Sequence, residues 1–298
     1  VMYETARTPA AAPRALEQPR PSAKQLADLN MLLAHADRPL VIAGAPLWSR
    51  KSARDLETFA ERYGLPVAAA FRRQDRLDNT HPFYVGHLGF APHARLAAAV
   101  RDADVLIVLG QCLNDVTTAG FTLVKDIEAQ KLVLIAPDAE TPSAPYVPDL
   151  AIAACPMSAV EALSVLPTPG KTPPWGKWRT SLRSAYEASL AAGTSVDDNA
   201  PAIRLDLIMD ELARVLPDGA IVCSGAGAYA AAVHRHYVYR GFPAQLAPIS
   251  GSMGYGLPAA MAAKLAHPEL PVIAIAGDGC LQMTAQEIVT AVQYDLPI

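Results

Sequence analysis

The sequence predicts an α/β protein with two doubly wound parallel-sheet domains. Short runs rich in Val, Ile and Leu alternate with segments of helical periodicity, and this alternation occurs twice along the 298 residues. The runs are almost continuously apolar, as strands buried on both faces are. Hydrophobic residues make up 51% of the chain and charged residues 18%, which suits a compact protein with many buried strands.

The first half alternates strands and helices after a proline-rich lead-in, residues 1–21. Ser22 is placed to cap a helix that ends near His35. The pattern then predicts helices over Ser52–Tyr63 and Pro92–Val100, and strands over Pro39–Ala43, Pro66–Ala70, Asp104–Leu109, Lys131–Ala136 and Leu150–Ala153. We therefore assign residues 22–166 to a first, Rossmann-like domain.

Residues 167–201 interrupt the alternation, because they open with prolines and end in polar, turn-rich sequence around one helix over Trp178–Leu190. We interpret them as an interdomain connection. Alternation then resumes over residues 202–298, which we assign to a second domain. We expect a helix over 205–216, strands over Ala220–Cys223 and Pro271–Ala276, and a helix from about Ala285 to Tyr294. Thr284 and Glu287 have the spacing of a capping box at the start of that last helix.

Both ends of the sequence suggest a longer protein. Leu296-Pro297-Ile298 has the pattern of the entry to another strand, so we expect the second domain to be truncated at its C-terminus. Val1-Met2-Tyr3 does not have the form of a native start, and no signal peptide is visible there.

Several classes of partner are disfavoured. A formal charge of -4 and scattered basic residues give no footprint for nucleic acid, and no apolar run is long enough to cross a membrane. The four cysteines lack the spacing of a zinc or redox motif, so we expect a reduced, cytoplasmic setting. We interpret Arg72, Arg73 and Arg76 as a solvated loop, and His234 and His236 as part of a solvated or interfacial helix face.

The Gly277-Asp278-Gly279 segment follows a buried strand, at the sheet edge where open α/β sheets bind ligands. Glycines let the backbone approach a bulky anion, and Asp278 offers the hard oxygen that suits Mg²⁺ or Ca²⁺. Alone, the segment is equally compatible with a tight turn between a strand and a helix.

Two further glycine-rich segments lie upstream. Residues 250–263 read SGSMGYGLPAAMAA, a loop followed by a helix of small residues, and Ser224–Gly227 follows a strand of its own. The second segment partly resembles a dinucleotide fingerprint, but no second strand with an acidic end follows at the expected distance. We therefore do not expect NAD.

Together and in this order, the three segments resemble the diphosphate-binding domain of thiamine-diphosphate enzymes, and most closely the acetolactate synthase group. The matching stretches are Gly251–Ala260, Gly277–Gly279 and Gln286-Glu287. Residues 23–166 are also similar to the central domain of that family, including residues 71–75, His81-Pro82 and residues 86–89.

This resemblance implies the roles of individual residues. Asp278 would bind the metal ion, Mg²⁺, that anchors the diphosphate of the cofactor. Gly251 and Met253 would bind the aminopyrimidine through their backbones, and the Met253 side chain would hold thiamine diphosphate in its bent shape. Backbone groups would surround the phosphates at Ala226, Gly227, Gly277, Gly279 and Cys280.

The resemblance also implies an activity, namely decarboxylation of a 2-keto acid followed by carboligation to a second carbonyl compound. The open alternatives are a benzoylformate-type decarboxylase, which releases an aldehyde, and a non-catalytic nucleotide-binding or assembly module. We expect a homo-oligomer, a dimer or tetramer, because the family places its cofactor between two subunits.

Some parts of the family pattern are missing. No catalytic residue is expected within this chain, because the activating glutamate belongs to a domain that would precede Val1, and an asparagine metal ligand would follow Ile298. We therefore expect the isolated chain to be inactive, unless another chain of a split enzyme supplies the missing domain. The segments that would hold FAD, residues 43–46 and 111–116, lack the expected arginine, so we favour a central domain without a nucleotide over FAD.

Overall fold

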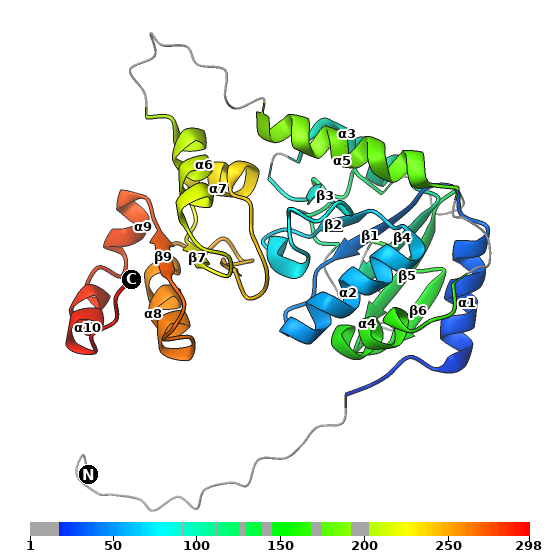
Figure 1. Cartoon of the computed structure of the whole chain (residues 1–298), viewed down its shortest axis with the longest axis horizontal. Helices are drawn as coiled ribbons and strands as arrows, with labels where there is room; N and C mark the ends of the chain where they lie inside the picture. The colour runs from blue at the N-terminus through cyan, green and yellow to red at the C-terminus, as the bar shows by residue number, and fades with distance from the viewer. Residues whose placement is uncertain are drawn as a thin grey trace, which may run out of the picture.

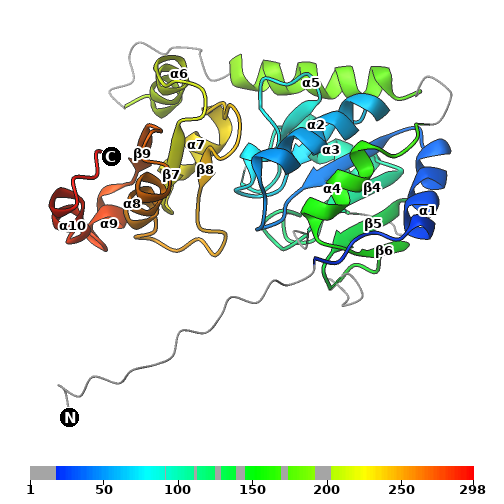
Figure 2. The same cartoon turned by 60° about the horizontal axis from the view of Figure 1, so that its bottom comes forward.

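The computed structural model describes residues 18–90, 92–110, 113–124, 129–138, 145–168, 174–191 and 203–298. These residues form two α/β lobes, one built on a six-stranded sheet and one on a three-stranded sheet (Figures 1 and 2). Every strand pair in both sheets is parallel. The predicted fold class is confirmed.

We call the lobe with the six-stranded sheet the central lobe and the lobe with the three-stranded sheet the second lobe. The strands of the central lobe are hydrogen-bonded in the order β3-β2-β1-β4-β5-β6. Because the order reverses direction between β1 and β4, this sheet is doubly wound. Buried side chains fill β1 and β4 along their whole length. The strand bounds are β1 Pro39–Ala43, β2 Val67–Ala69, β3 Tyr84–His87, β4 Val105–Leu109, β5 Lys131–Ala136 and β6 Leu150–Ala153.

Helices cover this sheet, and α2 and α4 lie side by side in front of it in Figure 1. The predicted Ser22 cap is present, since its hydroxyl accepts the N–H of Gln25 and the Gln25 side chain accepts the N–H of Ser22. Helix α2 begins after Ser49, which caps it, and not at Ser52. The bounds are α1 Ala23–Ala34, α2 Arg50–Tyr63, the 3-10 turn η1 Gln74–Arg76, α3 Ala94–Asp102, α4 Pro156–Ser164 and α5 Gly176–Ala191.

Helix α5, expected within the interdomain connection, packs into the core of the central lobe. The Trp178 indole donates to the carbonyl of Pro39 at 3.1 Å, and the Trp175 indole donates to that of Tyr63 at 3.0 Å. Arg183 of α5 donates to carbonyl groups of the 79–84 loop. The helix is therefore fixed to the central lobe by apolar burial and by hydrogen bonds, while the predicted domain boundaries stay a prediction.

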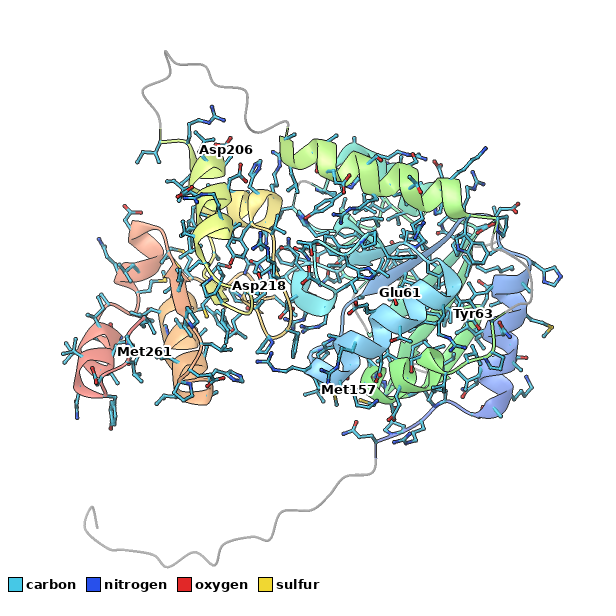
Figure 3. The ribbon with its side chains drawn as sticks, in the orientation of Figure 1. Glu61, Tyr63, Met157, Asp206, Asp218 and Met261 are labelled. Atoms are coloured by element: carbon cyan, nitrogen blue, oxygen red, sulfur yellow. The ribbon has the colours of Figure 1, made fainter. Side chains whose placement is uncertain are left out.

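The second lobe has the strand order β8-β7-β9. Helix α8 packs along β7 and β9 through small residues, and its Met261 meets Leu257 and Ala291 in a small apolar cluster (Figure 3). The bounds are α6 Leu205–Val215, β7 Ile221–Ser224, α7 Tyr229–His236, β8 Gln245–Leu246, α8 Gly256–Ala266, β9 Val272–Ile275, α9 Asp278–Gln282 and α10 Glu287–Gln293.

The predicted capping box at Thr284 is wrong. The Thr284 hydroxyl donates to the carbonyl of Gly254 at 3.1 Å, so it ties α10 to another loop and does not cap the helix. Helix α10 begins at Glu287, after Gln286, which makes no side-chain capping bond. A long-range hydrogen bond thus takes the hydroxyl that the local pattern assigned to the cap.

The two lobes meet through buried polar groups of the segment 72–79. The Asp75 carboxylate accepts the N–H groups of Ala244 and Gln245, at 3.2 and 3.1 Å, and pairs with Arg76 at 2.6 Å. The prediction of a solvated arginine loop is wrong for Arg72 and Arg76, which are only 3% and 5% exposed. Arg72 donates to His234 and Pro248 of the second lobe, whereas Arg76 donates to the carbonyls of Gly44 and Ala45. The local sequence reveals neither set of partners.

Candidate functional site

Two turns lie next to each other at the carboxyl edge of the smaller sheet. Strand β7 ends at Ser224 and is followed by Gly225, and β9 ends at Ile275 before Gly277. The strands pair in parallel, and the N–H of Gly225 donates to the carbonyl of Ile275 at 3.3 Å. The two turns predicted from separate stretches of sequence therefore form one surface, in the position where α/β sheets bind ligands.

Glycines in these turns allow close packing of Tyr229 and Cys280. A β-carbon on Gly225 would lie 2.2 Å from the Cys280 Sγ and 2.7 Å from the Tyr229 hydroxyl. A β-carbon on Gly227 or Gly277 would lie 2.8 Å or 3.0 Å from the Tyr229 ring. The glycines thus leave room for Tyr229 and Cys280, a role that the sequence reasoning did not assign to them.

The third glycine-rich segment joins the same surface. The N–H of Gly254 donates to the Cys280 Sγ at 3.2 Å, and a β-carbon on Gly279 would lie 3.5 Å from the Met253 methyl group. A β-carbon on Gly256 would lie 3.1 Å from the backbone nitrogen of Gly225, so α8 packs closely against the first turn. The structure therefore brings all three predicted segments together.

The predicted cofactor-binding residues divide into an open and a buried set. Ala226 and Cys280 are buried and support the surface from below, and Gly277 is half-buried. The exposed set comprises Gly227, Gly251, Met253, Asp278 and Gly279. A ligand can therefore reach the exposed set, which includes the expected metal ligand Asp278 and Met253.

Asp278 is the first residue of α9, and its carboxylate is exposed. It forms no hydrogen bond or ion pair with any residue of the described ranges. A carboxylate without a protein partner, next to glycine backbone, is a suitable oxygen ligand for Mg²⁺. The donor set is thus compatible with a metal-bound diphosphate.

Two hydroxyl groups at this edge lack a hydrogen-bond partner among the described residues. They belong to Ser224, which is 1% exposed, and to Tyr229. Burial raises the pKa of Tyr229, so its hydroxyl stays protonated and can donate. Buried hydroxyls usually have a partner, so hydrogen bonding at this edge is incomplete within the described residues. Nothing in the sequence marked the Tyr229 hydroxyl as a polar group of the site, and Ser224 carried no signal beyond its place at a strand end.

The helix α7 histidines are not solvated. His234 and His236 are 2% and 7% exposed. His234 lies at the contact between the lobes, where its Nε2 accepts from Arg72 Nε at 3.3 Å and its Nδ1 meets Gln74 Oε1 at 3.1 Å. The solvated reading is therefore wrong, and the interfacial reading is correct for His234.

One other group in the described part of the chain has the composition of a metal site: Glu57, Glu61 and His81, with Glu61 marked in Figure 3. His81 Nδ1 accepts the N–H of Phe83 at 3.3 Å, so in the neutral ring the proton is on Nε2, which faces Glu61 at 3.2 Å. The nitrogen that faces the carboxylates is therefore a donor and not a metal ligand.

The turn considered for FAD is occupied by protein groups. Arg76 donates to the carbonyls of Gly44 and Ala45, and a β-carbon on Gly110 would lie 2.6 Å from the Ala45 nitrogen. Gln111 and Cys112 of the second segment lie outside the described residues. The absence of FAD stays a prediction.

No helix in the described ranges is long and apolar enough to cross a membrane.

Comparison with known proteins identifies both lobes. Residues 26–163 match the family model of the thiamine pyrophosphate enzyme central domain, and residues 225–298 match that of the C-terminal TPP binding domain.

Curated relatives agree with these matches. Sulfoacetaldehyde acetyltransferase of Rhodobacter capsulatus is 27% identical over 95% of this chain and 51% of its own length. Acetolactate synthase of Mycobacterium avium is 26% identical over 94% of the chain and 45% of its own length. The acetolactate synthase large subunit of Haemophilus influenzae is 27% identical over 88% and 46%. The chain spans about half the length of these relatives, and it belongs to the thiamine pyrophosphate enzyme family.

Proposed function

We propose that the protein acts in the thiamine-diphosphate- and Mg²⁺-dependent decarboxylation of a 2-keto acid, followed by carboligation to a second carbonyl compound. The observation that carries this proposal is the convergence of three glycine-rich segments around Asp278, whose exposed carboxylate has no partner in the described ranges. Two partnerless hydroxyls at the same edge add to it.

Each part of this surface has a task in the proposal. The Asp278 carboxylate would hold Mg²⁺, and the first N–H groups of α9, which have no acceptor within the helix, would be free to bind phosphate oxygens. When bound, thiamine diphosphate supplies the electron sink for decarboxylation.

Met253 is suited to shape the site. Its side chain is 44% exposed, and its methyl group lies next to Gly279, between the loop of residues 250–254 and the start of α9. An apolar side chain there excludes water and limits the conformations that a bound cofactor can adopt. We propose that it supports the bent cofactor.

The names of the relatives favour carboligation over simple decarboxylation. Acetolactate synthase and sulfoacetaldehyde acetyltransferase are both named for the joining or transfer of a carbon unit. We therefore propose a second carbonyl compound as the acceptor, in an enzyme that works as a homo-oligomer. Release of free aldehyde in place of a condensed product would point to the decarboxylase alternative.

Calorimetric titration of the native protein tests the cofactor assignment. We expect thiamine diphosphate to bind in the presence of Mg²⁺, and NAD and ADP not to bind. Asp278→Ala should weaken this binding by about tenfold or more, since a metal ligand is lost. Asp218→Ala, which removes a carboxylate elsewhere in the same lobe (Figure 3), serves as the matched control and should bind normally. Equal affinity in wild type and Asp278→Ala would refute the site.

A further inference from the structure

A buried arginine of the central lobe reaches the candidate site from outside it. Arg72 is 3% exposed and adopts a left-handed φ of 57°. Its guanidinium lies 4.9 Å from the centre of the Phe71 ring. Since a left-handed φ is unfavourable for residues other than glycine, tertiary contacts hold the backbone of Arg72 in this conformation.

Both hydrogen-bond partners of the Arg72 guanidinium in the described ranges are neutral. Its Nε donates to His234 Nε2, and its Nη1 donates to the carbonyl of Pro248. No carboxylate pairs with it there, whereas the neighbouring Arg76 pairs with Asp75. A buried cation without a counter-charge is costly, so simple stabilisation of the fold is a poor explanation for Arg72.

His234 is fixed in one tautomer by its surroundings. Because Nε2 accepts from Arg72, the ring proton lies on Nδ1 and is donated to Gln74 Oε1. Gln74 in turn donates to the His234 carbonyl at 2.9 Å, and its Oε1 accepts from Gln245 Nε2 at 3.1 Å. Each group in this series of hydrogen bonds has a defined donor or acceptor role, which gives the Arg72 guanidinium a defined orientation.

The Pro248 carbonyl connects Arg72 to the candidate site. The same oxygen accepts the N–H of Gly251 at 3.0 Å, which closes a turn over residues 248–251, and Gly251 has a φ of 73°. Met253 follows two residues later. The direction of one carbonyl group, held by two donors, therefore sets where the loop of residues 250–254 begins.

We infer that Arg72 is a positioning residue, through which the central lobe holds the Gly251–Met253 loop in the geometry that binds the aminopyrimidine end of the cofactor. This role rests on the proposed function. It explains why a charge is buried between the lobes without a counter-ion, since the guanidinium has two fixed neutral acceptors on the second lobe. In this role the central lobe contributes to cofactor binding through the loop, without contact between Arg72 and the cofactor.

Binding measurements on the native protein test this role with two probes. In Arg72→Met, the dissociation constant of thiamine diphosphate with Mg²⁺ should rise about tenfold or more, because a charged hydrogen bond to the loop is lost. The dissociation constant of inorganic pyrophosphate with Mg²⁺ should change less than about twofold, because that probe has no aminopyrimidine. Arg54→Met removes an exposed arginine of α2 and should leave both constants unchanged.

Two further experiments test whether a loss of binding in Arg72→Met arises from misfolding. Arg72→Lys keeps the charge but lacks the planar fork that serves two acceptors, and it should show the same selective loss. Millimolar guanidinium chloride should restore thiamine diphosphate binding to Arg72→Met, whereas urea at the same concentration should not.

The outcomes separate the two proposals. Wild-type protein that fails to bind thiamine diphosphate overturns the proposed function and the role of Arg72 with it. Normal thiamine diphosphate affinity in Arg72→Met, beside a wild type that binds, overturns the positioning role alone. Equal losses for both probes would overturn it as well, because they would mean that Arg72 acts on the diphosphate by its charge.

Discussion

Replacement of Gly225 by alanine tests the packing on which the candidate site depends. Gly225 has no left-handed φ, so the cost of the added methyl group arises from space and not from backbone strain. The new β-carbon would lie 2.2 Å from the Cys280 Sγ, which is 1.2 Å short of the 3.4 Å where ordinary contact begins. It would also lie 2.7 Å from the Tyr229 hydroxyl.

Such overpacking in a filled interior costs about 1–3 kcal/mol. We expect Gly225→Ala to lower the free energy of unfolding by this amount in a urea titration followed by far-UV circular dichroism. Gly176→Ala is the matched control, since a β-carbon there meets nothing within 4 Å. The control should be unchanged, or more stable by up to about 1 kcal/mol.

A double-mutant cycle tests whether the steric clash is between the new β-carbon and the Cys280 Sγ. In Gly225→Ala/Cys280→Ala the Sγ is gone, and the two β-carbons lie at an ordinary separation of 3.8 Å. The second substitution should therefore cost less in the Gly225→Ala background than in wild type, with a coupling of about 1 kcal/mol. Additive effects, or a Gly225→Ala variant within about 0.5 kcal/mol of wild type, would refute this packing.

Three further predictions concern stability. Asp75→Ala leaves Arg76 buried without its ion-pair partner and should lower the unfolding free energy by about 3–5 kcal/mol in a urea titration; Asp75→Asn, which keeps one acceptor, should recover part of that loss. Burial lowers the pKa of His234 from 6.5 to about 3, so its contribution to stability is complete above pH 6.5 and is lost as the pH falls toward 3. Between pH 6.5 and 5.5, the free energy of unfolding of His234→Asn should consequently fall by about 1 kcal/mol less than that of the wild type. An equal fall in both proteins would contradict the buried neutral ring. Ser22→Ala removes the capping box of α1 and should cost about 1 kcal/mol, whereas an unchanged urea midpoint would show that the cap contributes nothing.

Much of the fold was predictable because its strands are buried on both faces. The apolar runs Pro39–Ala43, Lys131–Ala136 and Leu150–Ala153 have the bounds expected from the sequence. Strand β3 was not predicted, since Tyr84–His87 contains a glycine and pairs with β2 through an irregular register. The two-residue strand β8 is too short to produce a periodic pattern.

The location of the candidate site was predictable for a different reason. Gly225, Gly251 and Gly277 mark three loops, and their order along the chain carried the resemblance to the family. The neighbours of these loops were not predictable, because they are set by contacts between distant parts of the chain. Arg72, interpreted with Arg73 and Arg76 as a solvated loop, is buried because it meets a histidine that is 162 residues away in sequence.

Asp75 also has a consequence for solubility. Strand β8 lies at one edge of the described three-stranded sheet, and an open sheet edge invites pairing with strands of other molecules. The Asp75 carboxylate occupies the N–H groups of Ala244 and Gln245, so an intruding strand finds these donors already taken. Expression of the second lobe without the segment 72–79 would uncover this edge and favour aggregation. A chimaera that exchanges the central lobe would therefore need a carboxylate at the position of Asp75 to keep the recombined protein soluble.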